Sequence, residues 1–220
     1  MSKIYIVGTP IGNLKDITLR ALEVLRSVDY VACEDTRTSI KLLNHYEIKK
    51  PLLSHHLFNE KNSTKGILKL VNEGKTVALI SDAGMPIISD PGFNLLKEAK
   101  KNNIDFEIIP GVSASTLAFA YSSLGNNFTF LGFLESKTNQ IKKQLTRLTK
   151  GVYVAFISPH KLITTMTIFQ ENFNENAEIY LLKELTKINE KHFFGTPSEV
   201  LNKLNNNSLK GEFTIVFKIY

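Results

Sequence analysis

Short apolar runs of strand length alternate with segments whose apolar residues recur at helical spacing along nearly the whole chain. In the first half, the runs predict strands at 3–7, 30–33, 51–54, 76–81 and 106–109. The first helix would present Ile17, Ala21, Leu25 and Val28 on one face, and further helices are expected at 39–46, 59–73, 92–102 and 113–124.

The second half continues the same alternation. Strands are expected at 128–133, 152–157, 178–184, 191–194 and 213–219, with helices at 139–148, 159–171 and 197–204. Regular alternation of strands and helices predicts an α/β fold with parallel sheets. Because 220 residues can form two domains of about 100 residues each, we expect two α/β domains, 1–115 and 116–220.

Composition narrows the protein class. No apolar run approaches the roughly 18 residues of a membrane helix, and the single cysteine, Cys33, fits a reducing cytoplasm and is expected to be a small core residue. The net charge of +6 permits a polyanionic partner. The basic residues are 23 Lys and only 4 Arg, a bias that nucleotide composition alone can produce, so the charge by itself barely favours RNA.

Ligands of open α/β sheets bind beyond the carboxyl ends of the strands, which directs attention to the loops there. The first such loop, Gly8-Thr9-Pro10-Ile11-Gly12-Asn13, has the glycines of a close-approach turn, but an ordinary turn capped by Asn13 explains it as well. It is not a dinucleotide-binding fingerprint.

The loop 81–92 is more informative. It has two Asp, two Gly and two Pro within twelve residues, whereas a merely connecting loop is typically about 2 to 6 residues long. A long, stiff loop after a buried strand is usually functional. Asp82 could accept hydrogen bonds from a ribose or an amino group, and Asp90 is expected to cap the following helix.

Two further strand ends carry candidate chemistry. Small residues in 110–115 allow a flat ring to pack closely, although a helix cap explains them equally well. Glu34-Asp35-Thr36-Arg37 places three charged residues after a strand, and a surface turn with an internal ion pair is one explanation. An arginine retained in a Lys-rich chain suggests that its planar fork is needed for a carboxylate or a phosphate.

Other signals are weak. His55-His56 lacks further ligands at metal spacing, so no metal site is expected. The densest basic stretch, 137–150, is a solvated helix face or an RNA contact.

Several motifs in order along the chain carry a family resemblance. They are 6–14 with 17–18 and 20–22, Glu34-Asp35-Thr36-Arg37, 81–92, Pro110-Gly111 with Ser113-Ala114, 132–134, 158–162, 183–187 and Gly211-Glu212. This pattern resembles the ribosomal RNA ribose methyltransferases of the tetrapyrrole-methylase type. Departures are Gly8 in place of a usual Pro, Met85 in place of Thr, Ile157 in place of an acidic residue and Lys183 in place of Arg.

The resemblance implies two α/β domains with S-adenosylmethionine in the cleft between them, a cytoplasmic homodimer without a membrane segment, and 2′-O-methylation of a cytidine ribose in the decoding region of 16S rRNA of the small ribosomal subunit. Implied cofactor contacts are Pro10, Asp82, Ala83, Gly84, Ile87, Ser113, Ala114, Glu184 and Leu185. Implied RNA contacts are Arg37, Lys142, Lys143 and Arg147.

A ribose hydroxyl needs a base or a nearby cation for methyl transfer. Candidates are Glu34, Asp35, Glu184 and Lys187, among which the sequence does not choose; Arg37 is a further catalytic candidate. Two alternatives stay open: a methyltransferase acting on a small tetrapyrrole such as a corrin, and a non-catalytic RNA or nucleotide binder.

Overall fold

The computed structural model describes residues 2–205 and 207–220, which form two compact units, Met1–Ser113 and Ala114–Tyr220. We call them the N-terminal and C-terminal units and describe each by itself. The division lies two residues before the boundary expected from the sequence. Both units are α/β, in agreement with the predicted fold class.

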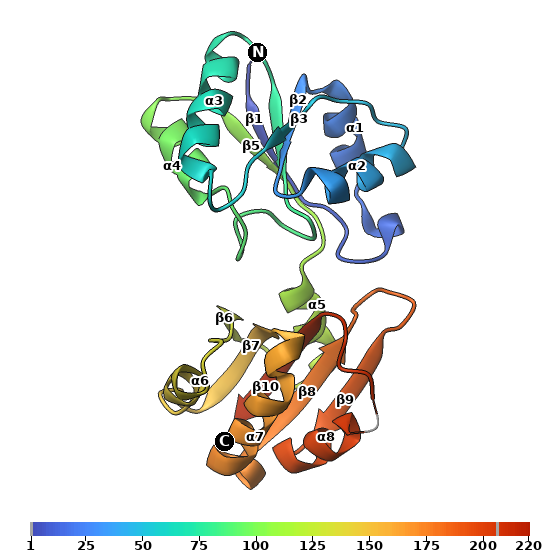
Figure 1. Ribbon diagram of the computed structural model, residues 1–220, viewed down its shortest axis with the longest axis vertical. Helices are drawn as coiled ribbons and strands as arrows, with labels where there is room; N and C mark the ends of the chain where they lie inside the picture. The colour runs from blue at the N-terminus through green and yellow to red at the C-terminus, as the bar shows by residue number, and fades with distance from the viewer. Residues whose placement is uncertain (1, 206) are drawn as a thin grey trace. The chain divides into compact units, whose positions relative to one another are not determined.

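The N-terminal unit is a parallel sheet covered on both faces (Figure 1). Its strands, in the order β3-β2-β4-β1-β5, are β1 (Ile4–Val7), β2 (Tyr30–Cys33), β3 (Leu52–Ser54), β4 (Val77–Ile80) and β5 (Phe106–Ile109). Helices α1 (Leu19–Ser27) and α2 (Thr36–His45) contribute to one hydrophobic cluster, and α3 (Glu60–Asn72) and α4 (Phe93–Lys101) to another.

The apolar pattern of the strands follows from this layering. All four residues of β4 are buried, because the strand lies between β2 and β1 with helices over each face. Cys33 is buried in the cluster under α1 and α2, as expected for a small core residue. Since all five strands are parallel, their carboxyl ends lie at one edge of the sheet.

The C-terminal unit has a mixed sheet of the order β6-β7-β10-β8-β9 (Figure 1). Its strands are β6 (Thr129–Phe133), β7 (Gly151–Ile157), β8 (Ala177–Lys183), β9 (Lys191–Gly195) and β10 (Phe213–Ile219). Its helices are α5 (Ala114–Ser122), α6 (Thr138–Leu145), α7 (Leu162–Asn172) and α8 (Pro197–Leu204). One large cluster joins inner faces of the strands to α6, α7 and α8.

The expectation of parallel sheets is wrong for this unit. Strand β10 pairs antiparallel with both β7 and β8, and β8 pairs antiparallel with β9. The cause is the one connection without a helix, the hairpin from β8 to β9, which reverses the chain. The crossover through α8 then delivers β10 parallel to β9, into the position between β7 and β8.

Element boundaries also shift. Helix α2 begins three residues earlier than expected because Asp35 caps it: the Asp35 side chain accepts the backbone N–H of Arg37. Among the residues that the structure describes, none of the helices is both long and apolar enough to cross a membrane.

Candidate functional site

Three strand-end loops of the N-terminal unit meet through their backbones. Thr9 N–H donates to Gly84 O at 2.8 Å, and Gly8 N–H donates to Ile109 O at 3.0 Å. Gly8 and Gly111 are in such close contact that a Cβ built on Gly8 would lie 2.7 Å from Gly111 Cα. The loops after β1, β4 and β5 therefore form one backbone-lined surface at the carboxyl edge of the sheet.

The loop after β4 has an unusual backbone. Gly84, Ile87 and Ser89 have φ angles of 77°, 79° and 69°. A β-branched residue such as Ile87 strongly disfavours this region, so the surrounding packing must hold the loop in place. A Cβ on Gly84 would also lie 3.1 Å from Ile11 Cγ2. The loop is thus stiff and closely approached, as its sequence predicted.

The prediction that Asp90 caps α4 is wrong. The N-cap residue is Gly92, and it has no side-chain cap. Glu60, at the start of α3, caps the helix instead: its Oε1 accepts from Gly92 N and Asn94 N at 2.9 and 3.2 Å, and its Oε2 accepts from Asn94 Nδ2 at 2.7 Å. No local pattern marks this cap, because the capping side chain comes from another helix.

Asp90 instead belongs to a group of carboxylates. Burial, the nearby charge of Glu34 and that of Asp82 raise the pKa of Asp90 to about 6, against an opposing hydrogen bond from Ser81. Burial first, and then Asp82, raise the pKa of Glu34 as well, while His56 lowers it. The pKa of Asp82 is raised as well. Part of its carboxyl group is shielded from water, although the residue as a whole is exposed. We call Glu34, Asp82 and Asp90 the carboxylate cluster.

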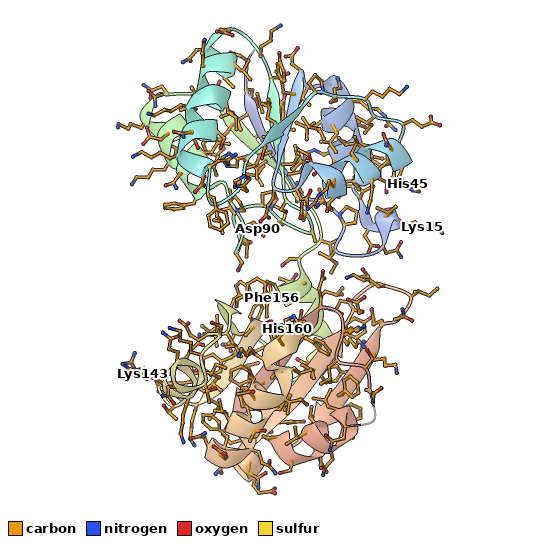
Figure 2. The ribbon with its side chains drawn as sticks, in the orientation of Figure 1. Lys15, His45, Asp90, Lys143, Phe156 and His160 are labelled. Carbon is orange, nitrogen blue, oxygen red and sulfur yellow. The ribbon has the colours of Figure 1, made fainter. Side chains whose placement is uncertain are left out.

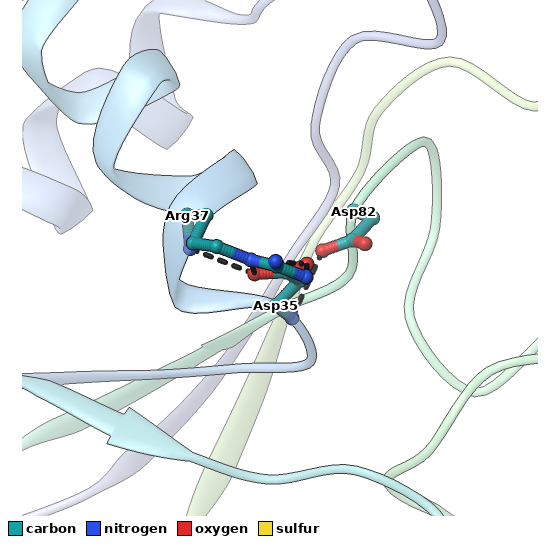
Figure 3. Close-up of polar contacts among 3 residues, drawn as sticks. All are labelled: Asp35, Arg37 and Asp82. Atoms are coloured by element: carbon teal, nitrogen blue, oxygen red, sulfur yellow. Dashed lines mark hydrogen bonds and ion pairs between the residues drawn. The ribbon is translucent and has the colours of Figure 1, made fainter.

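Asp35 connects Arg37 to this cluster (Figure 3). The Arg37 guanidinium binds the Asp35 carboxylate through Nε and Nη2, the latter at 2.7 Å, and holds the pKa of Asp35 at about 2. The backbone N–H of Asp35 donates to Asp82 Oδ1 at 3.1 Å. Asp35 orients Arg37 without a contribution from the neighbouring Glu34. The Arg37 side chain is 87% exposed, so most of its fork can still meet a ligand.

The C-terminal unit holds the second group of candidates. Lys187 Nζ pairs with Glu184 Oε1 at 3.0 Å and with Glu212 Oε2 at 3.1 Å. Glu184 also accepts the N–H of Glu212 at 2.8 Å, and although burial opposes it, these bonds lower its pKa. A Cβ on Gly211 would lie 2.8 Å from Glu184 Oε1. The pairing makes Lys187 a retained cation rather than a base.

The remaining expected cofactor residues are divided between the units. Pro10 is buried, Ala83 is exposed, and Ser113 is the last residue of the N-terminal unit. Ala114 is the first residue of α5, and Leu185 is buried, both in the C-terminal unit. Their contact with a cofactor stays a prediction.

The expected RNA residues Lys142, Lys143 and Arg147 are all exposed, the first two on α6 and the third just beyond it. Figure 2 labels Lys143 on this helix. Ile141 and Leu145 form the buried face of that helix. This arrangement fits a solvated basic face as well as a phosphate contact.

No set of three or more His, Cys, Asp or Glu within residues 2–205 and 207–220 is arranged to hold a metal ion. His55 is buried, with Nδ1 2.8 Å from Ser63 Oγ, and burial lowers its pKa. A hollow of about 380 Å³ lined by α2 and the segment before β3 lies at the amino end of that strand, away from the carboxylate cluster.

Residues 3–201 match the family model of the Tetrapyrrole (Corrin/Porphyrin) Methylases. The chain is 57% identical to Ribosomal RNA small subunit methyltransferase I of Mycoplasmopsis pulmonis, over 100% of this chain and 99% of that protein. It is 46% identical to the protein of the same name from Thermotoga maritima, over 98% of each. The Bacillus subtilis protein of that name is 39% identical, over 98% of this chain and 75% of its own length.

Solved structures show the same fold at low sequence identity. The uroporphyrin-III-C-methyltransferase from Thermus thermophilus has a TM-score of 0.72 and 20% identity, covering 99% of this chain and 94% of its own. Diphthine synthase has a TM-score of 0.73 and 17% identity, covering 99% and 90%.

Proposed function

The chain belongs to the tetrapyrrole (corrin/porphyrin) methylase family, and from that membership we propose that it transfers a methyl group from S-adenosylmethionine to the ribose 2′-hydroxyl of a cytidine in the decoding region of 16S rRNA. Its sequence relatives align over nearly its whole length and are named as methyltransferases of the small-subunit ribosomal RNA. The enzymes named for tetrapyrrole substrates share only the fold. Sequence likeness therefore favours ribosomal RNA over a corrin, and an enzyme over a binding module.

The carboxylate cluster fits the methyl donor in charge. S-adenosylmethionine carries a cationic sulfonium and an ammonium group, and it supplies an already activated methyl group. After burial, the charge of Asp82 raises the pKa of Glu34, and the charges of Glu34 and Asp82 raise the pKa of Asp90. A positively charged ligand would relieve this repulsion. The close contacts at Gly8, Gly84 and Gly111 leave a backbone surface suited to close approach by a ligand.

Glu34 has the properties required of the base. Its side chain is half-buried and burial raises its pKa, which makes it a stronger base than an ordinary carboxylate. Asp35 is unsuited because Arg37 holds its pKa at about 2. Glu184 is unsuited because it is bound by Lys187 and Glu212 N.

Arg37 would then hold a phosphate or a ribose oxygen of the RNA. Its guanidinium is exposed and already oriented by Asp35, so little side-chain freedom is lost on binding. The exposed face with Lys142, Lys143 and Arg147 adds sequence-independent attraction for the phosphate backbone.

The proposal is tested by incubating the chain with radiolabelled S-adenosylmethionine and small ribosomal subunits, naked rRNA or a corrin, followed by mapping of the modified nucleotide. Label on a cytidine 2′-oxygen of the small subunit is expected. Label on the corrin alone would establish the tetrapyrrole alternative. The Glu34→Gln variant should transfer little label, a loss much larger than any weakening of donor binding that follows from removing one charge of the cluster.

The resemblance also suggests a homodimer, working in the cytoplasm where ribosomal subunits are found. A stable monomer in sedimentation at micromolar concentration would contradict the dimer.

A further inference from the structure

The turn between β3 and α3 presents an aromatic ring fully to solvent. Phe58 is 100% exposed and its neighbour Leu57 is 64% exposed. The turn beneath them is rigid: Asn59 Oδ1 accepts from His56 N at 2.8 Å, and Asn59 Nδ2 donates to Ser54 O at 3.1 Å. The exposure of Phe58 is therefore built into an ordered turn.

A second exposed ring lies at the same end of the neighbouring helix. Phe93, the first residue of α4, is 64% exposed. The N–H groups on either side of it, of Gly92 and Asn94, are bound by Glu60 at the start of α3. Helices α3 and α4 both follow strands of the parallel sheet and share a hydrophobic cluster, so their first turns lie together (Figure 1).

Phe58 and Phe93, which we call the phenyl pair, belong to none of the hydrophobic core clusters. A solvent-exposed phenyl group gains little burial energy, and rigidly displayed apolar groups commonly mark an interaction site. Exposed lysines lie near the pair on the helices that carry or follow it. Lys61, Lys65 and Lys97 are exposed in the first two turns of α3 and α4. Of the two acids there, Glu60 is buried and bonded, and Glu98 pairs with Lys101 at 3.9 Å.

The phenyl pair adjoins the carboxylate cluster. His56 contacts the ring of Phe58 edge-on, with centroids 6.1 Å apart. The same His56 is near enough to Glu34 to lower its pKa. One RNA strand could therefore contact the phenyl pair and also place its reacting hydroxyl beside Glu34.

We propose that the phenyl pair, with Lys61, Lys65 and Lys97, is a stacking platform for unpaired nucleotides that flank the methylated cytidine. A single-stranded nucleic acid offers a flat base and a negative phosphate at each step, which matches rings interleaved with lysines. A polar contact to the ribose 2′-hydroxyl would let the site select RNA. The carboxylates nearby repel phosphate, but Asp35 is neutralised by Arg37 and the cluster would face the cationic donor. This inference rests on the proposed RNA substrate.

The test measures binding of the full-length chain to an unstructured twelve-nucleotide RNA that contains one 2-aminopurine. Phe58→Leu and Phe93→Leu keep an apolar side chain but lose the ring, and each should weaken affinity at least about fivefold and reduce the quenching of 2-aminopurine. Phe58→Tyr and Phe93→Tyr keep the ring and should stay within about twofold of wild type. Phe194→Leu, at a ring 59% exposed in the C-terminal unit, is the matched control and should have no effect.

The outcomes separate this inference from the proposed function. Equal affinity for all variants, or equal losses for Leu and Tyr variants, would overturn the platform. A change of sedimentation instead of RNA affinity in the Leu variants would assign the surface to a second copy of the chain. Ring-dependent RNA binding without methyl transfer to small subunits would support the platform and refute the proposed reaction. Methyl transfer with ring-independent binding would do the reverse.

Discussion

Met85 occupies the space that a side chain at position 8 would need. A Cβ built on Gly8 would lie 2.7 Å from Met85 Sδ. Both positions are among the departures from the resemblance described in the sequence analysis. The absence of a side chain at position 8 therefore leaves room for the Met85 side chain within the loops of the candidate site.

This relationship predicts coupled stability effects. Gly8→Ala should destabilise the chain by about 1–3 kcal/mol, because the added methyl group collides with Met85 and with the Gly111 backbone. Met85→Thr in the same chain should recover part of that loss, while the Gly111 contact retains the rest. Urea unfolding of the two single variants and the double variant measures the coupling. Strictly additive losses would show that the two departures are independent.

A second prediction concerns donor binding at Gly84. Ala at this position must adopt φ near 77° and should lose about 1–2 kcal/mol of stability. A loss of donor binding in such a variant therefore needs a control for backbone strain. Gly74 has φ 89°, and a Cβ added there would have no atom within 4 Å, so Gly74→Ala carries the same strain away from the loops.

Calorimetry with S-adenosylmethionine then separates the two variants. Gly84→Ala should weaken binding of the donor, since its methyl group enters the surface beside Ile11 and Val112. Gly74→Ala should bind as wild type does. Equal affinities would remove the loop after β4 from the donor site.

A third prediction uses the pH dependence of stability. The folded pKa of Asp90, about 6, exceeds the ordinary value of 3.8, so the folded state holds its proton longer than the unfolded state. Stability therefore falls as the pH rises from about 4 to 6. Asp90→Asn should be more stable than wild type above pH 6, by at most about 3 kcal/mol, and equal to it below pH 4.

Asp29→Asn is the opposing control. Thr76 donates its N–H to Asp29 Oδ2 at 2.8 Å, which lowers the pKa of that carboxyl. The stability from this bond is present above the ordinary pKa and is lost as the pH falls, so Asp29→Asn should destabilise at neutral pH. Thermal melts from pH 3 to 8 measure the stability change of each variant, which should be positive for Asp90→Asn and negative for Asp29→Asn near neutral pH. A wild-type-like profile for Asp90→Asn would contradict the raised pKa.

A fourth prediction assigns Arg37 to substrate handling. Its exposed guanidinium makes no contact with the core, so Arg37→Ala should leave the melting temperature and donor affinity nearly unchanged. Methyl transfer to small subunits should fall roughly tenfold to a hundredfold, because a charge-assisted contact is lost. Arg37→Lys should be nearly as damaging, since a point charge cannot replace the fork. Parallel loss of stability and donor affinity would make Arg37 a structural residue instead.

Local patterns predicted much of the fold. The apolar run of β4 and the apolar spacing of Ala21 and Leu25 are visible in short stretches of sequence. The α/β class and most helices and strands could therefore be predicted from the sequence. The direction of β10 could not be predicted from its own residues. It depends on the helix-free hairpin between β8 and β9, whose effect appears only when the strands assemble.

The candidate site divides in the same way. The strand ends where the candidate side chains gather could be predicted from the glycines and prolines of the loops and from the unusual Arg37. These signals depend only on a few residues that are adjacent in the sequence. Tertiary structure alone decided that Glu60 rather than Asp90 caps α4 and that Asp90 joins Glu34 and Asp82. Burial and charge repulsion depend on distances between residues far apart in the chain, and such distances exist only after folding.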